Sequence, residues 1–225
     1  MKPIIGIVEW PYLDKDNDYI YEVLTPIIEW VIRSGGRPLG IFPSNIEAFV
    51  DKRLSEITPI SEIEHQDLIE SIKLCDAIIK PGATKIYEYC YKENIPYLGI
   101  CAGMQMMAAY QNDIKNEKNN STVIHNSKEL YSHKVLIQEL TLLKKLLNKE
   151  EIMVNSHHNY HITSSGCHNI SALAVDNVIE AIESPSHDFH IGVQWHPELL
   201  PKEDENSQII FGELIESAKI YNKRK

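Results

Sequence analysis

The sequence is poor in cysteine and has no long hydrophobic segment. Its four cysteines, at positions 75, 90, 101 and 167, show no CxxC spacing, which a redox motif or a thiolate metal site would require. No apolar run approaches membrane-spanning length, and no signal-like segment precedes Pro3. We therefore expect a cytoplasmic protein with reduced thiols that does not act at a membrane.

Basic residues are also in the minority. The 225-residue chain has 22 lysines and arginines against 32 aspartates and glutamates, which gives a formal net charge of -10 at pH 7. Such a charge disfavours nucleic acid and anionic lipid as partners. Hydrophobic residues make up 43% of the chain, enough for a sizeable core, and no internal repeat is visible. We expect a single domain over residues 1–225.

Short apolar runs alternate with helix-like segments along the chain. This alternation is typical of an α/β fold in which helices cover both faces of a mainly parallel sheet. It predicts a Rossmann-like, flavodoxin-like three-layer core followed by short C-terminal antiparallel strands, with a turn at Asp176-Asn177. The stretch from Gln111 to Lys128 lacks periodicity and is predicted to be a mobile surface loop. The predicted strands are 4–8, 38–42, 76–80, 97–100, 152–155, 170–175, 178–182 and 190–194, and the predicted helices are 20–34, 85–94, 102–110 and 206–221.

One cysteine stands at a predicted strand-to-helix turn. Cys101 directly follows the strand at 97–100, has Gly99 and Gly103 around it, and precedes a helix. A reactive side chain on such a turn needs small neighbours because the backbones crowd there. The amides at the start of the next helix favour the thiolate form. We predict that Cys101 is a nucleophile. The other three cysteines are predicted to be buried and inert: Cys75, Cys90 and Cys167.

A second motif, at 192–198, reads GVQWHPE. It supplies an imidazole at His196 and, two residues later, a carboxylate at Glu198. A cysteine nucleophile requires such a base and an acid that orients it. We therefore predict a catalytic triad of Cys101, His196 and Glu198.

These motifs resemble the class I glutamine amidotransferase superfamily. Within it they are most similar to the stand-alone γ-glutamyl hydrolases of peptidase family C26, the γ-glutamyl-γ-aminobutyrate hydrolase type. The resemblance covers nearly the whole chain. Its most specific parts, in chain order, are the elbow at 99–105, VNSHH at 154–158, VIEAIESP at 178–185 and GVQWHPE at 192–198.

The resemblance implies an oxyanion hole made of backbone amides. One donor would be Ala102, and the other would come from the turn at Gly82-Ala83. The family usually has two glycines in that turn, and Ala83 resists the positive φ that glycine allows. Lys80, just before the turn, either extends its stem along a strand end or recognises an anionic leaving group.

The resemblance also implies substrate-binding residues. Gln105 resembles the glutamine that helps to hold the glutamyl group, the alternative being a role in helix capping or packing. The loop residues Ser156, His157 and His158 are implied to border the glutamyl pocket. The family commonly has a long insertion before the elbow, whereas this chain has only residues 84–94 there. We therefore expect the substrate pocket to be more open on the side that holds the leaving group.

The run SHHNYH at 156–161 raises the question of a metal site. His157, His158 and His161 lie close together in the sequence, and His168 follows. However, no cysteine or carboxylate is suitably spaced and no HExxH helix is present. The sequence alone therefore predicts no metal and no cofactor.

Together these residues predict a hydrolase that cuts a γ-glutamyl amide through a γ-glutamyl thioester. Two alternatives stay open: a glutaminase subunit that passes ammonia to a separate synthase, and a binding or regulatory protein on the same scaffold. The lack of a recognisable synthase segment weakens the first, and the intact triad counts against the second. The amine and any assembly of identical copies are not determined by the sequence.

Overall fold

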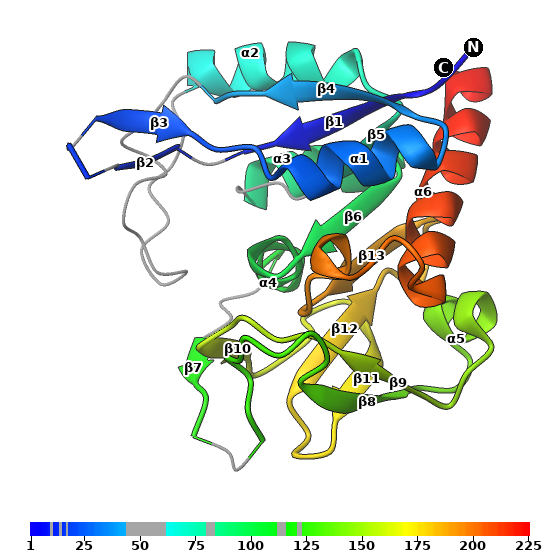
Figure 1. Cartoon of the computed structure of the whole chain (residues 1–225). Helices are drawn as coiled ribbons and strands as arrows, with labels where there is room; N and C mark the ends of the chain where they lie inside the picture. The colour runs from blue at the N-terminus through cyan, green and yellow to red at the C-terminus, as the bar shows by residue number, and fades with distance from the viewer. Residues whose placement is uncertain are drawn as a thin grey trace.

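The computed structural model describes residues 1–9, 11–13, 15–16, 18–43, 62–79, 84–111, 116–120 and 123–225. A nine-stranded sheet runs through this part of the chain (Figure 1). Its strands, in spatial order, are β4 (Arg37–Ile41), β1 (Ile4–Val8), β5 (Ala77–Ile79), β6 (Tyr97–Ile100), β13 (His190–Val193), β12 (Ile179–Glu183), β11 (Asn169–Ala174), β8 (His133–Ile137) and β9 (Glu151–Val154).

The strand pairing changes from parallel to antiparallel at β13. From β4 to β13 every neighbouring pair is parallel, whereas from β13 to β9 every pair is antiparallel. Asn177, with a φ of 68°, lies in the turn between β11 and β12, where the sequence predicted a hairpin. The predicted parallel core with antiparallel C-terminal strands is confirmed.

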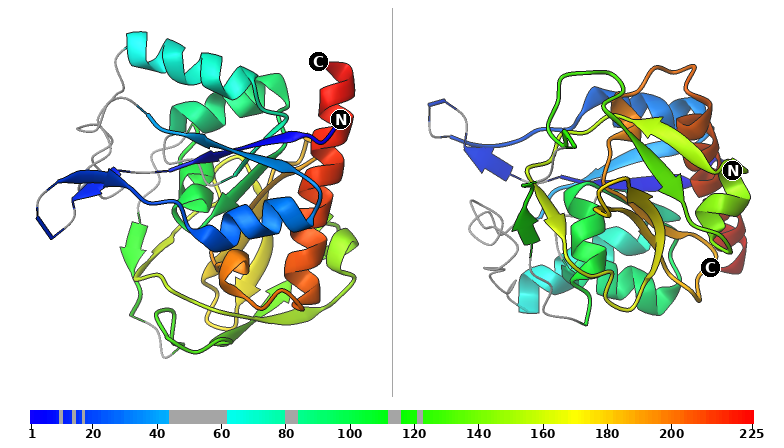
Figure 2. Two further views of the ribbon diagram at one scale, coloured as in Figure 1. Left: turned by 45° about the horizontal axis from the view of Figure 1, so that its top comes forward. Right: turned by 90° about the horizontal axis from the view of Figure 1, so that it is seen from below.

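Helices cover both faces of the parallel part of the sheet (Figure 2). On one face α1 and α6 contact each other, and on the other face α2 packs on α3, which contacts α4. None of the described helices is both long and apolar enough to cross a membrane. The described helices are α1 (Thr25–Arg33), α2 (Glu62–Lys73), α3 (Thr84–Glu93), α4 (Ala102–Ala108), α5 (Leu142–Leu147) and α6 (Glu205–Arg224), with a 3-10 turn, η2, at Pro197–Leu199.

Side chains of β5 alternate between two hydrophobic cores. Ala77 and Ile79 belong to the same buried cluster as Trp30 of α1 and Phe211 of α6. Ile78, which points the other way, belongs to the cluster beneath α2 and α3. A strand buried on both faces is expected in a parallel sheet with helices on either side, and the predicted three-layer core follows from it.

The first helix begins later than the sequence predicted. Tyr19–Tyr21 forms a strand, β3, which pairs with β2 (Pro11–Leu13), and α1 begins only at Thr25. Pro26 lies in the first turn of α1, where a proline loses no helical hydrogen bond. The predicted start at residue 20 is wrong because the apolar pattern continues through a strand before the helix begins.

The segment predicted as a mobile loop contains ordered structure. Asn116–Lys118 forms β7, which pairs antiparallel with β10 (Tyr160–Ile162), and His125 is buried. The loop prediction is wrong for these residues. Residues 112–115 and 121–122, from the same segment, lie outside the described part of the chain.

Candidate active site

Cys101 occupies a strained turn between β6 and α4. Its φ is 53° and its ψ is -106°, and a positive φ is uncommon for a residue with a side chain. A Cβ on Gly99 would lie 2.8 Å from the carbonyl carbon of Gly103, so the close approach of strand and helix requires a glycine. The turn has the strand, elbow and helix order that the sequence predicted.

The strand β13 brings the second motif beside this turn. It pairs in parallel with β6, and the amide of Cys101 donates to the carbonyl of Val193 at 2.8 Å. Beyond the end of β13, Nδ1 of His196 lies 2.7 Å from Oε1 of Glu198. The Glu198 side chain has no exposed area, and that of His196 is 13% exposed. The fold thus brings together the three residues of the predicted triad.

The pKa of His196 reflects its two polar neighbours. Burial lowers this pKa, but hydrogen bonds with Cys101 and Glu198, and their negative charges, raise it to about 10. The imidazole therefore carries a proton at neutral pH when Cys101 is ionised. A thiolate beside an imidazolium is the charge distribution of an activated cysteine nucleophile.

Asn155 holds the backbone of His196 at two points. Its Nδ2 donates to the His196 carbonyl at 2.8 Å, and its Oδ1 accepts from the His196 amide at 2.9 Å. Asn155 follows β9 and is buried. Asn155 belongs to the VNSHH motif at 154–158; no role for it was predicted, and its place in that motif is the sequence signal that could have indicated one.

Two buried glutamines form a hydrogen-bonded pair, and one of them reaches the thiol. Nε2 of Gln194 is 3.5 Å from Sγ of Cys101, and Oε1 of Gln194 accepts from Nε2 of Gln105 at 3.0 Å. Gln105 also donates to the carbonyl of Tyr160 at 3.2 Å. The predicted substrate-binding amide is therefore engaged by the protein. Gln194, for which no role was predicted, is the glutamine that contacts the sulfur.

The three loop residues predicted to touch substrate differ in exposure. His157 is exposed, and its ring centroid lies 5.7 Å from that of His196. Ser156 is buried and donates its hydroxyl to the carbonyl of His125 at 2.7 Å, and His158 is buried as well. Direct substrate contact fits His157, but the burial of Ser156 and His158 does not fit that prediction.

One of the predicted oxyanion donors can be placed. Ala102 is the first residue of α4, so its amide has no partner within the helix and can serve an oxyanion next to the nucleophile. The other predicted donors, at Gly82 and Ala83, lie outside the described residues. Lys80 lies outside them too.

The remaining cysteines differ from Cys101 in their surroundings. Cys75 and Cys90 are buried, as predicted; burial raises the pKa of Cys75 to about 12 and also raises that of Cys90. Cys167 is exposed, so the prediction that it is buried is wrong. Partial desolvation nevertheless raises the pKa of its thiol.

A group of potential metal ligands meets in the interior beside the active-site loops. Its members are His125, His133, His158 and Glu180. The histidine run considered in the sequence contributes His158 to this group. The prediction of no metal was based on the lack of a suitably spaced carboxylate, and the fold supplies one from β12.

The fold and the Cys-His-Glu geometry define a cysteine-based site on a flavodoxin-like sheet. The chain belongs to the Peptidase C26 family, whose sequence model matches residues 66–198, a span that includes Cys101, His196 and Glu198. It is accordingly a member of the class I glutamine amidotransferase-like superfamily of cysteine-dependent amidotransferases and hydrolases.

Similar proteins include CTP synthases and a protein described as a glutamine amidotransferase. A CTP synthase of Chlamydia trachomatis is 26% identical over 82% of this chain, but the match covers 41% of the synthase, so this chain spans less than half of its length. A Schizosaccharomyces pombe protein described as a glutamine amidotransferase is 28% identical over 88% of this chain and 83% of its own. A crystal structure of a Thermoplasma acidophilum protein, described as a GMP synthase subunit, covers 100% of this chain and 98% of its own, with a TM-score of 0.68 and 16% identity. This last likeness shows the fold.

Proposed function

We propose that this protein is a cysteine hydrolase of γ-glutamyl amides. The observation that carries the proposal is the site itself, in which Cys101 adjoins His196 and Glu198 holds the imidazole at 2.7 Å. Membership of the Peptidase C26 family and the glutamine amidotransferase relatives support amide cleavage by a cysteine. Glutamine is itself the simplest γ-glutamyl amide. Hydrolases of γ-glutamyl amides and glutamine amidotransferases therefore act on the same γ-glutamyl group.

The first half-reaction transfers the γ-glutamyl group to sulfur. Sγ of Cys101 attacks the γ-carbonyl carbon, and the carbonyl π electrons move to the oxygen, where the amide of Ala102 stabilises the negative charge. As the oxyanion collapses, the C–N bond breaks and the His196 imidazolium protonates the departing amine. A γ-glutamyl thioester and neutral His196 remain.

The second half-reaction releases glutamate. His196 takes a proton from water, the resulting hydroxide attacks the thioester carbonyl, and the C–S bond breaks to return the thiolate. Glu198 fixes the imidazole tautomer and stabilises the imidazolium in both halves. In this scheme Asn155 orients His196, His157 borders the substrate, and no cofactor is required.

A second candidate is a glutaminase that supplies ammonia to a separate synthase. Its support comes from relatives, because the similar proteins include CTP synthases and the similar structure is described as part of a GMP synthase. The same triad would hydrolyse glutamine by the same steps. A non-catalytic binding protein is the third reading, and the complete triad speaks against it.

Turnover of defined substrates separates the three readings. The purified protein is incubated with glutamine and with several γ-glutamyl derivatives of larger amines, and glutamate release is measured. We expect the short segment before the elbow to leave room for a leaving group larger than ammonia. We therefore expect at least one larger derivative to exceed glutamine in kcat/KM by about 10-fold, equivalent to about 1.4 kcal/mol of transition-state stabilisation.

The same assay identifies the competing outcomes. Glutamine preferred over every larger amide, with activity that rises on addition of a second protein, would favour the glutaminase reading. Cys101→Ala serves as the matched control and is expected to abolish turnover. Wild-type protein no more active than this variant on any substrate would favour the non-catalytic reading.

A further inference from the structure

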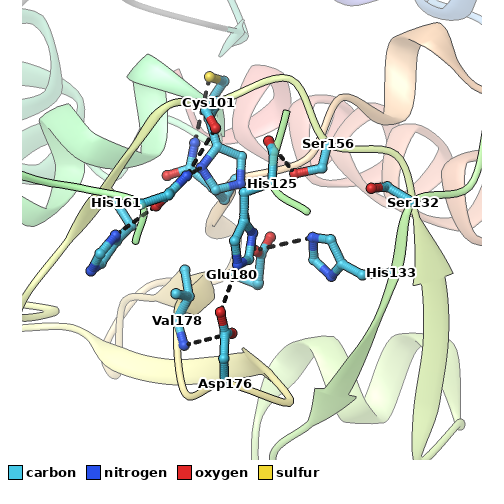
Figure 3. A network of polar contacts seen from close by, with 12 residues as sticks. Cys101, His125, Ser132, His133, Ser156, His161, Asp176, Val178 and Glu180 are labelled. Carbon is cyan, nitrogen blue, oxygen red and sulfur yellow. Dashed lines mark hydrogen bonds and ion pairs between the residues drawn. The ribbon is translucent and has the colours of Figure 1, made fainter. Parts of the chain in front are cut away.

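Four buried side chains converge from segments that are far apart in the sequence. His125 lies before β8, His133 begins β8, His158 lies between β9 and β10, and Glu180 belongs to β12. Figure 3 shows the side chains of His125, His133 and Glu180 gathered in one place. Each of the four offers one ligand atom, and these atoms all lie within 4.8 Å of one another. The four residues are between 0% and 7% exposed.

The atoms that face the centre of this cluster lack hydrogen bonds. Among the described residues, Nδ1 of His125, Nε2 of His133, Nε2 of His158 and both carboxylate oxygens of Glu180 are buried without a hydrogen-bond partner. Buried polar atoms are nearly always paired, because leaving one unpaired costs about 1–3 kcal/mol. The three ring nitrogens lie within ion-pair distance of Oε1 of Glu180, but none of the five atoms completes a hydrogen bond. So many unsatisfied atoms in one place need an explanation.

The atoms that face away from the centre are all held. Nε2 of His125 lies 2.9 Å from the Asp176 carboxylate. Nδ1 of His158 lies 3.0 Å from the carbonyl of Tyr160, and Nδ1 of His133 lies 3.4 Å from the carbonyl of Lys134. If each outer nitrogen donates its proton to these oxygens, each inner nitrogen presents a lone pair. Histidines that bind metals are oriented in this way.

The distances from the three inner nitrogens to Glu180 are those expected between ligands of a small metal ion. The three inner nitrogens lie 3.2, 3.5 and 3.5 Å from Oε1 of Glu180. Ligands of a tetrahedral zinc ion, at about 2.0–2.1 Å from the metal, are separated from one another by about 3.3 Å. The carboxylates of Glu180 and Asp176 would balance the charge of a divalent ion.

We propose that His125, His133, His158 and Glu180 bind one divalent transition-metal ion, zinc in the first instance, as a closed structural site. Three imidazoles favour zinc and its neighbours in the first transition row over magnesium or calcium, which prefer oxygen ligands. Four protein ligands also leave no open position for a substrate, as in other structural zinc sites.

The site would fix the loop that supports the catalytic base. The backbone amide of His158 and the hydroxyl of Ser156 both donate to the carbonyl of His125, at 2.9 and 2.7 Å. Asn155, at the start of this loop, holds the backbone of His196. The metal would thus tie the 155–158 loop to the segment that contains His125.

Metal binding is tested directly by stoichiometry. Untagged protein is stripped with a chelator, equilibrated with Zn²⁺, desalted, and analysed for bound zinc. Because Cys101 and His196 could capture zinc themselves, the measurement is repeated with Cys101→Ala. We expect one zinc per chain in both proteins. We also expect a rise of at least about 5 °C in the unfolding midpoint and, with Co²⁺, the intense visible bands of tetrahedral coordination.

Substitutions then locate the ion. His133→Gln and Glu180→Gln are expected to lose zinc and its effect on the unfolding midpoint, and Asp176→Asn, which removes an outer partner, is expected to weaken zinc binding about 10-fold. His161→Gln is the matched control, because His161 belongs to the same histidine run but its ring lies 2.7 Å from Asn119 instead. This variant should keep one zinc.

Two results would overturn the proposal. The first is wild-type protein that retains no zinc or cobalt and shows no change in its unfolding midpoint; the cluster would then be a buried hydrogen-bond network. The second is retention of one zinc by both His133→Gln and Glu180→Gln. If neither variant folds, the wild-type stoichiometry and cobalt spectrum decide the question.

Discussion

At the scale of single residues, the proton on His196 is held by two neighbours of different kinds. Cys101 is the proposed nucleophile, whereas Glu198 is buried and reaches the imidazole with one oxygen at 2.7 Å. Both raise the pKa of His196 against the opposing effect of burial, to about 10. Replacing Glu198 by glutamine removes the negative charge and keeps the shape of the side chain, so the electrostatic contribution of the carboxylate can be measured alone.

Glu198→Gln should lower both the rate and the upper pH limit of activity. If the imidazolium is needed, wild-type kcat/KM should fall as the pH rises through about 10. Without the Glu198 charge the pKa of His196 is lower, so the fall should begin at a lower pH. The loss in kcat should approach about 10⁴-fold, the cost of removing the orienting acid from a triad.

The matched control for this substitution is Glu216→Gln. Glu216 is exposed and pairs with Lys219 on the surface of α6, and such pairs contribute little to stability. A Glu198→Gln protein with nearly wild-type kcat and an unshifted pH limit would contradict the orienting role.

Thiol reactivity should rank the four cysteines. Iodoacetamide at neutral pH should label Cys101 first, because an imidazolium beside it favours the thiolate. Exposed Cys167 should follow, while burial should protect Cys75 and Cys90 until the protein unfolds. Mass spectrometry of peptides at successive times measures the order. Labelling of Cys167 before Cys101 would contradict the assignment of the nucleophile.

At the scale of elements, the contact between β6 and α4 depends on Gly99. A Cβ there would lie 2.8 Å from the Gly103 carbonyl carbon and 2.9 Å from the Met104 amide nitrogen. Gly99→Ala must therefore push the helix away, and we expect a loss of about 1–3 kcal/mol in the free energy of unfolding, together with reduced kcat.

Gly212→Ala is the matched control for this prediction. A Cβ on Gly212, within α6, would meet nothing within 4 Å. Alanine in a helix interior is favoured over glycine by about 0.5–1 kcal/mol, so this variant should be slightly stabilised. Urea denaturation of both variants measures the difference, and equal effects of the two substitutions would contradict the crowding argument.

The sequence predicted some elements better than others. The strands Ile4–Val8 and Tyr97–Ile100 have the predicted bounds because a buried parallel strand is apolar along its whole length. The strand β8 was missed because its residues alternate between buried and exposed over only five positions. The helix α5, with six residues, is too short for its periodicity to be recognised, and α2 was also missed.

The two candidate sites also differ in how well the sequence predicts them. The grouping of Cys101, His196 and Glu198 could be predicted because each residue lies in a local motif, at an elbow or two positions apart. The His125, His133, His158 and Glu180 cluster could not, since its members come from four segments that meet only when β8, β11 and β12 pair. The spacing of these four residues along the chain therefore does not predict that they lie together.

At the scale of the whole molecule, one sheet separates two hydrophobic cores. Trp30 and Trp195 belong to the cluster on the α1 and α6 face, and Cys90 belongs to the cluster beneath α2 and α3. Because strands such as β5 contribute side chains to both clusters, neither core can come apart without disrupting the other. We propose on this basis that the chain folds as a single domain.

Unfolding should therefore be a single transition. In urea, the midpoint measured by tryptophan fluorescence should coincide with the midpoint at which Cys90 becomes reactive towards a thiol reagent, as two-state behaviour requires. Cys101→Ala protein removes the reactive thiol from the second measurement. Two clearly separated midpoints would show that the two faces unfold independently and would contradict the single-domain proposal.

The parallel pairing of β6 with β13 has a consequence for how such an enzyme can change. Gly99 lies opposite Gly192 in the register, and neighbouring strands are spaced about 4.8 Å apart. Cys101 and His196 therefore follow adjacent strands however long the chain between them is. Insertions in loops between residues 102 and 190 that keep the strands and Asn155 in place should alter the surroundings of the site and leave the distance between sulfur and imidazole unchanged. New leaving-group specificities can therefore evolve in this scaffold through changes in loop length, without rebuilding the reaction centre.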